Sequence, residues 1–205
     1  MTDRGYDTVH LDDLDRIELV EMHGCEWRPI RRRFGIQSFG VNAYTAANPG
    51  DWIVEEHTEG RLQHQEIYFV VRGRARFTLD GEDLDAPAGT IVFLEDPMVK
   101  RVAVAEEEGT TVLAMGAKPG EPFSPSAWEW WFEAYSKAPE EGVEIMKDGV
   151  RTLGAQAGLY YHLACMESKA GRKDDARRSL ERAIELRPEL REQARDDPDL
   201  DGVAT

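Results

Sequence analysis

Residues 57–73, HTEGRLQHQEIYFVVRG, and residues 75–97, ARFTLDGEDLDAPAGTIVFLEDP, determine the fold that this chain is expected to adopt. The first stretch opens with four polar side chains that suit a binding site, namely His57, Glu59, His64 and Glu66. It continues as an apolar strand, and the second stretch contains Asp80-Gly81, a turn typical of β-hairpins. The pattern therefore predicts a polar site inside a β-structure.

Short strand-like segments extend this pattern over residues 36–118. They alternate between apolar and polar residues or run apolar, and turn signals such as Asn48-Pro49-Gly50 and Asp96-Pro97 separate them. Side chains alternate between the two faces of a strand, so Glu66 and Tyr68 are expected to share one face. Several short strands with regular turns predict a sandwich or a barrel.

The chain changes character after the strands. Residues 119–126 contain three prolines and are expected to be a linker, and residues 127–205 have helical periodicity. Residues 1–35 are expected to be a polar lead-in that packs on the β-structure, with a helical stretch from Leu11 to Met22. The predicted class is α+β, with a β module followed by an α module.

Composition narrows the possible partners. The 205 residues carry a formal net charge of −15, which argues against nucleic acid because phosphates would be repelled. The basic cluster Arg28, Arg31, Arg32 and Arg33 is expected to balance nearby acids. No run of 18 apolar residues predicts a membrane span, and no signal peptide is recognisable. Two distant cysteines, Cys25 and Cys165, suggest reduced thiols and a cytoplasmic protein.

Glu66 and Gly73 stand at the spacing of one sequence motif, with Gly50 seven residues before His57. Pro87-Ala88-Gly89 matches part of a second motif. Through them residues 36–118 resemble the cupin superfamily, whose fold is a double-stranded β-helix (jelly-roll) barrel. The resemblance implies that the Glu66 face lies inside the barrel. The chain departs from the family because no histidine follows Pro87-Ala88-Gly89 at the second motif, where Lys100 or Arg101 falls instead.

Two interpretations of the site follow. His57, His64 and a carboxylate, Glu59 or Glu66, could supply the ligands of one divalent metal, iron, manganese, zinc or nickel. Alternatively the barrel holds no metal, because a cation at the position of the missing histidine pairs with Glu66 in its place. A small-molecule ligand, carboxylated for example, would then be bound by Tyr68, Arg72 and Lys100.

Residues 157–190 carry a second pattern, in which large and small side chains recur at fixed positions: Tyr160, Leu163, Ala164, Gly171, Ala176, Leu180, Ala183 and Pro188. This segment resembles a tetratricopeptide repeat, except that Glu167 stands where an aromatic residue is usual. Gly142, Met146, Gly149 and Gly154 suggest a degenerate repeat before it. One or two repeats cannot bury a continuous face, so they must pack on the barrel, on each other or on a second subunit.

Two functions are compatible with these features. The first is a binding protein, in which the barrel holds a small molecule and the helical repeats contact a protein partner. The alternative is a metal-dependent enzyme, a dioxygenase, isomerase or cyclase acting on a small organic substrate. The strand face formed by Ile67, Phe69 and Val71 is apolar and needs to be covered. We expect a homodimer to cover it; the alternatives are that the helical module packs on it or that it is buried within the sandwich.

Overall fold

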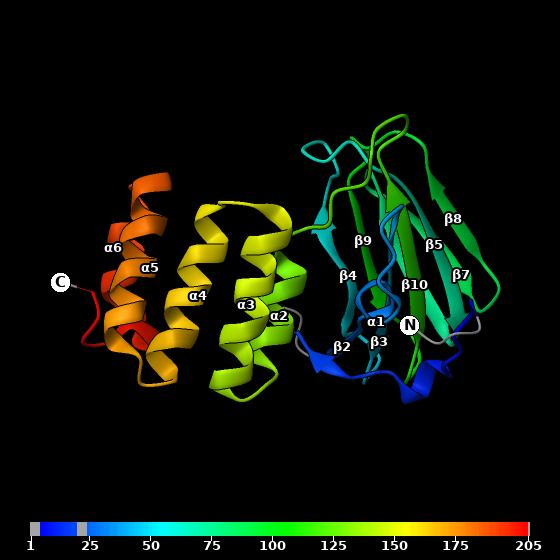
Figure 1. Ribbon diagram of the computed structural model, residues 1–205. Coiled ribbons are helices and arrows are strands. Elements are labelled where there is room, and N and C mark those ends of the chain that lie inside the picture. Colours follow the sequence, from blue (N-terminus) through cyan, green and yellow to red (C-terminus); the bar gives the residue numbers. More distant parts are fainter. Residues whose placement is uncertain (1–4, 20–23, 205) are drawn as a thin grey trace. The chain divides into compact units, whose positions relative to one another are not determined.

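The computed structural model describes residues 5–19 and 24–204. The chain divides into two compact units, residues 1–124 and residues 125–205. The first is built mainly of strands and the second of helices (Figure 1). We describe each unit by itself.

Two antiparallel sheets form the first unit. In its described part the larger sheet has the order β1-β2-β3-β10-β5-β8 and the smaller has the order β4-β9-β6-β7. The strands span β1 Ile17–Glu18, β2 Cys25–Arg28, β3 Gly40–Ala46, β4 Trp52–His57, β5 Gln65–Arg72, β6 Arg74–Leu79, β7 Glu82–Pro87, β8 Ile91–Leu94, β9 Arg101–Ala105 and β10 Thr111–Ala117. A short helix, α1 Ile30–Phe34, follows β2.

The core of this unit lies between the two sheets. Tyr68 and Val70 of β5 pack in one cluster with Phe77 of β6 and Ala103 of β9. The predicted Glu66–Tyr68–Val70 face is therefore the inner one. The sheets do not close into the predicted barrel, and the unit is a sandwich whose outer strands keep free edges.

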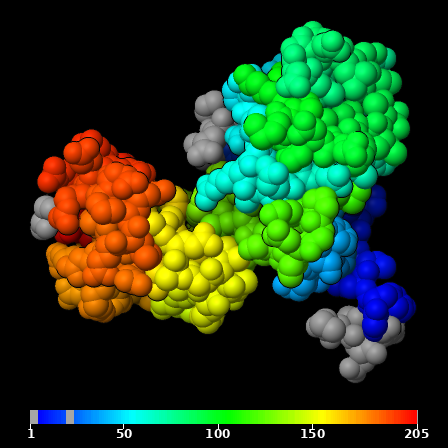
Figure 2. All heavy atoms as spheres, turned by 90° about the horizontal axis from the view of Figure 1, so that it is seen from above, coloured from blue at the N-terminus to red at the C-terminus, as the bar shows by residue number. Residues whose placement is uncertain are grey.

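The predicted helix from Leu11 to Met22 is wrong over the residues that the structure describes. A single 3-10 turn, Leu11–Asp13, is followed by extended backbone and by β1, and residues 20–22 lie outside the described part. β1 pairs with β2, with Ile17 opposite Trp27, so sheet formation replaces the helix. The lead-in thus adds strands to the larger sheet, while its first described residues lie on the flank of the unit (Figure 2, dark blue).

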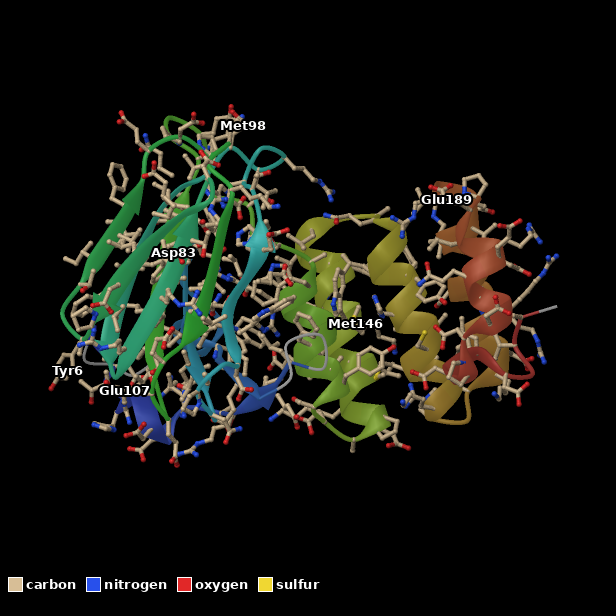
Figure 3. All side chains as sticks on the ribbon, turned by 180° about the vertical axis from the view of Figure 1, so that it is seen from behind. Tyr6, Asp83, Met98, Glu107, Met146 and Glu189 are labelled. Carbon is tan, nitrogen blue, oxygen red and sulfur yellow. The ribbon has the colours of Figure 1, made fainter. Side chains whose placement is uncertain are left out.

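Helices in the second unit follow one another with short turns: α2 Trp128–Tyr135, α3 Pro139–Leu153, α4 Ala157–Lys169, α5 Lys173–Leu186, α6 Leu190–Asp196 and the 3-10 helix η2 Pro198–Leu200. Small residues let neighbouring helices approach. Ala164, Ala176 and Ala183 are fully buried, and Gly149 lies so close to Trp130 and Leu159 that a methyl group there would collide with both. Met146 lies among the same helices (Figure 3).

The second unit also accommodates the residue that departs from the repeat pattern. Glu167 is buried and accepts a hydrogen bond of 2.7 Å from Ser179 Oγ, which provides a partner for the buried carboxylate. Cys25 and Cys165 are both free and buried. Within the described residues, each helix is too short or too polar to cross a membrane.

Candidate functional site

The candidate site lies where the ends of three strands meet. His57 ends β4 and pairs directly with Arg101, the first residue of β9, in the smaller sheet. Glu66 and Tyr68 project from β5 of the larger sheet, and the Tyr68 ring packs against Phe77 with centroids 5.6 Å apart. The site therefore joins both sheets above the apolar core.

Three of the four predicted metal ligands come together. The ligand atoms of His57, Glu59 and Glu66 all lie within 4.8 Å of one another, and each side chain is partly buried. His57 Nδ1 lies 2.8 Å from the carbonyl oxygen of Glu55, and because a carbonyl only accepts, the proton must be on Nδ1. The second ring nitrogen, Nε2, lies 3.8 Å from Glu59 Oε1.

Glu59 lies on the β4–β5 loop, residues 58–64, at the end of the sandwich marked by Met98 (Figure 3). Its amide donates to the carbonyl of Pro97 at 2.8 Å, which ties the loop to the turn before β9. Burial, together with the negative charge of Glu66, raises the pKa of Glu59 to about 7, although Arg101 acts in the opposite direction. Near neutral pH this carboxyl can exchange a proton.

His64 contacts the cluster only through Glu59. Its Nδ1 lies 3.7 Å from Glu59 Oε2, and its ring lies 6.1 Å from that of Phe123 between centroids. Burial lowers the pKa of His64, which favours the neutral imidazole, while Glu66 opposes this effect. The structure therefore places His64 beside the group of three and not within it.

Glu66 is held in place by its neighbours. Tyr68 donates its hydroxyl proton to Glu66 Oε2 at 2.7 Å, and Tyr68 is buried, so its pKa is raised well above the usual value. Gly116 of β10 stands opposite Glu66, where a Cβ atom would approach Glu66 Cγ to 2.9 Å. Gly116 thus provides the space that this side chain needs.

The sequence offered two candidates, Lys100 and Arg101, for the cation beside Glu66, and the structure places Arg101 there. Its side chain is 0% exposed, and its Nε lies 3.9 Å from Glu66 Oε2. Among residues 5–19 and 24–204, none offers a hydrogen-bond partner to its three side-chain nitrogen atoms. The signal that could have identified it is the alternation of Arg101 with Ala103 and Ala105, which are all buried on the inner face of β9.

The structure does not bring the two predicted ligand-binding cations, Arg72 and Lys100, to this cluster. Lys100 Nζ pairs with Glu56 at 2.8 Å, and both side chains are more than half exposed. Arg72 pairs with Asp12 at 2.8 Å at the far end of β5. A role of either in ligand binding stays a prediction.

The donor set fits a divalent metal ion. One imidazole and two carboxylates match the ligands preferred by iron(II), manganese(II) and zinc, and the orientation of His57 through its Nδ1 proton is the one that metal-binding histidines adopt. Arg101 supplies only one positive charge against the two carboxylates Glu59 and Glu66. A further cation close to Glu59 and Glu66 is therefore electrostatically favoured.

A second group of potential ligands lies in the helical unit. Cys165, Asp197 and Asp199 come equally close together. Their carboxylates already have partners, since Tyr161 donates to Asp197 at 2.7 Å and Lys169 Nζ lies 3.0 Å from Asp199. These contacts within the helical unit account for the close approach of the three side chains.

No family model matches the chain, and no curated protein matches it. Among solved structures it is similar to a sugar phosphate isomerase of the cupin superfamily from Silicibacter pomeroyi, with 20% identity over 55% of this chain and 76% of that one and a TM-score of 0.47. It is also similar to a predicted oxalate decarboxylase from Thermotoga maritima, with 16% identity over 55% and 99% and a TM-score of 0.44. A cupin protein from Bacteroides fragilis shows 18% identity over 60% and 92% and a TM-score of 0.44.

Proposed function

We propose that this protein binds a small molecule at the end of a cupin-type β-sandwich, together with one divalent metal ion. The observation that carries the proposal is the convergence of His57, Glu59 and Glu66, whose ligand atoms lie within 4.8 Å of one another. These side chains come from a strand end, a loop and the opposite sheet, and one imidazole with two carboxylates is a ligand set suited to a divalent ion.

Each residue would have a distinct part in such a site. His57, Glu59 and Glu66 would hold the ion, and Tyr68 and Gly116 keep Glu66 in position. When bound, a divalent ion supplies Lewis acidity to a substrate oxygen. Glu59 can accept or donate a proton at neutral pH in the absence of the ion, because burial raises its pKa to about 7.

A metal-dependent enzyme, such as a dioxygenase, isomerase or cyclase, is the second candidate. It is favoured by the number of ligands, because three protein ligands leave coordination positions for a substrate. Both candidate functions use the metal ion, but only the enzyme would convert its ligand into a product. Metal binding is therefore the first property to test.

We expect the protein purified without chelators to contain close to one equivalent of iron, manganese, zinc or nickel. His57→Ala removes a ligand and should reduce the content to about a tenth or less. Inductively coupled plasma mass spectrometry measures this. His10→Ala is the matched control, because His10 is an exposed histidine far from the cluster, and it should keep the metal. Equal metal content in the two variants would contradict the assignment.

A homodimer would cover the outer face of the larger sheet. Ile91 and Phe93 of β8 are 64% and 56% exposed, and they stand opposite Phe69 and Ile67 of β5. β8 is an edge strand, so it offers both unpaired backbone groups and apolar side chains to a second copy.

Phe93→Lys is expected to convert this dimer into a monomer, because a charge would be buried in the interface. Light scattering after size exclusion should give about twice the chain mass of 23.2 kDa for the parent protein and the single mass for the variant. Leu84→Lys on β7, the edge strand of the smaller sheet, should stay dimeric. A monomeric parent protein would exclude the dimer.

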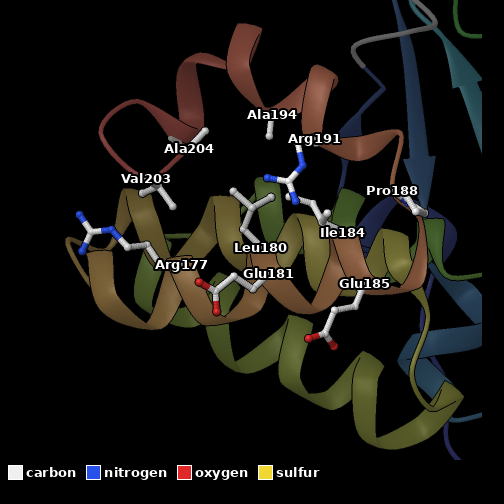
Figure 4. A pocket seen from close by; sticks show the side chains of 10 residues that line it. All are labelled: Arg177, Leu180, Glu181, Ile184, Glu185, Pro188, Arg191, Ala194, Val203 and Ala204. Carbon is white, nitrogen blue, oxygen red and sulfur yellow. The ribbon is translucent and has the colours of Figure 1, made fainter.

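The helical unit would contact a protein partner in this proposal. Its support is a groove of about 550 Å³ between α5 and the chain that follows it, lined by apolar side chains such as Leu180 and Ile184 and by the charged Arg177, Glu181 and Arg191 (Figure 4). A mixture of apolar and charged side chains is compatible with a protein-interaction surface.

A further inference from the structure

Arg101 is a buried cation whose hydrogen-bonding capacity is unused. Its side chain is 0% exposed, and Nε, Nη1 and Nη2 have no hydrogen-bond partner. A guanidinium has five N–H donors, and leaving them unpaired away from water is strongly unfavourable. A side chain in this position therefore needs an acceptor that the described part of the chain does not supply.

The nearest carboxylate does not meet this need. Glu66 Oε2 lies 3.9 Å from Arg101 Nε, which is beyond hydrogen-bonding distance, and the same oxygen already accepts the Tyr68 hydroxyl at 2.7 Å. Glu66 thus provides Arg101 with a nearby negative charge but with no hydrogen bond. The planar fork of the guanidinium remains available to another group.

We propose that Arg101 is the anchor for a carboxylate group of the small-molecule ligand. This inference rests on the proposed function and specifies its ligand class. A carboxylate presents two oxygen atoms that match the guanidinium fork and carries one negative charge. Beside Glu59 and Glu66, a carboxylate adds one negative charge to the site, whereas a phosphate adds nearly two at neutral pH and is therefore less favoured.

The ligand reaches Arg101 past the β4–β5 loop. Glu59 lies on this loop close enough for the charge of Arg101 to act on its carboxyl group, and His64, on the same loop, lies beside Glu59. The loop is tied to the turn before β9 by the hydrogen bond between the amide of Glu59 and the carbonyl of Pro97. Its tip, residues 61–63, is exposed. Binding then involves outward movement of this loop, and His57 at its start is the most open member of the cluster.

The direct test is a titration of the full chain, labelled with nitrogen-15, that follows the arginine Nε–Hε signals by NMR. The probes are sodium acetate and sodium benzoate, with acetamide and benzamide as uncharged analogues, sodium phosphate as the other anion, and sodium chloride at the same ionic strength. The Arg101 signal is assigned by its loss in Arg101→Lys. We expect the two carboxylates to shift this signal and the amides and chloride to leave it in place.

Arg101→Gln removes the charge and the fork, and it should weaken carboxylate binding by about 10- to 100-fold in calorimetry. Arg76→Gln is the matched control, because Arg76 is an exposed arginine of the same sheet and should bind as the parent protein does. Should Arg101→Gln fail to fold, Arg101→Lys keeps the positive charge but lacks the planar fork, and it should also bind carboxylates more weakly than the parent protein.

Several results would overturn the assignment. They are an Arg101 signal in the parent protein that does not respond to carboxylates, equal binding of the amides, or unchanged affinity in Arg101→Gln. A response to phosphate alone would overturn the choice of carboxylate. If one of these results were found while metal loading still depended on His57, the carboxylate anchor would be wrong and the proposed metal-binding function would stand. The failure of one proposal can therefore be distinguished from the failure of the other.

Discussion

Phe77→Ala is expected to lower the free energy of unfolding of the β unit by about 3–5 kcal/mol. Phe77 is fully buried in the core between the sheets, and its ring packs against Tyr68 with centroids 5.6 Å apart. Its removal would leave a cavity below the candidate site, because neighbouring strands cannot collapse far enough to fill the volume of a phenyl ring. The effect combines lost burial with lost packing.

Urea unfolding followed by tryptophan fluorescence and circular dichroism measures this loss. Leu84→Ala is the control, because Leu84 stands opposite Phe77 in the β6–β7 pair but is 38% exposed, and it should cost at most about 1 kcal/mol. Similar losses for the two variants would show that the space below Tyr68 is not the closely packed core described here. In Phe77→Ala we also expect weaker metal retention, since Tyr68 orients Glu66.

The inner face of β5 was predictable because it depends on local alternation. Glu66, Tyr68 and Val70 point to one side of any extended strand, and the resemblance to the cupin superfamily implied that this side faces the core. The helix pair α4–α5 was predictable for a similar reason, since Ala164, Ala176 and Ala183 are spaced as small residues between packed helices. Both patterns are contained within short stretches of sequence.

The sequence could not show whether Lys100 or Arg101 faces the site, because the answer depends on the register of β9. A shift of one residue in a strand moves every side chain to the other face. The register of β9 is fixed by pairing Arg101 with His57 on one side and with Leu79 on the other, and these contacts span many residues of sequence. The same dependence on distant partners explains β1, whose two residues form a strand only because β2 lies beside them.

Acidification is expected to destabilise the helical unit through His162 of α4. The His162 ring is enclosed by three aromatic rings, with centroid distances of 4.6 Å to Trp131, 5.7 Å to Tyr135 and 5.6 Å to Tyr161. This burial lowers the pKa of His162 from 6.5 to about 4, with Arg187 adding to the effect and with Asp197 and Asp199 partly opposing it. The folded state is therefore more stable with a neutral His162 imidazole than with a protonated one.

The direction of the pH effect follows from proton binding. Above the unfolded pKa of 6.5 the imidazole is neutral in both states, so it adds no pH dependence. As the pH falls from 6.5 towards 4, the unfolded chain binds a proton that the folded chain rejects, and the free energy of unfolding decreases. The expected loss is about 2 kcal/mol by pH 5 and about 3 kcal/mol at pH 4.

His162→Gln separates this effect from general acid sensitivity, because glutamine fills part of the same space but does not titrate. The variant should be less stable than the parent protein at neutral pH, since it loses ring contacts, yet its stability should change less between pH 7 and pH 5. Urea unfolding monitored by ellipticity at 222 nm follows mainly the second unit, which contains every described α-helix except α1. His10→Gln, at an exposed histidine of the first unit, should keep the parent's pH dependence. An unchanged pH dependence in His162→Gln would show that protonation of other groups controls the loss, because a neutral side chain at position 162 has no proton to gain.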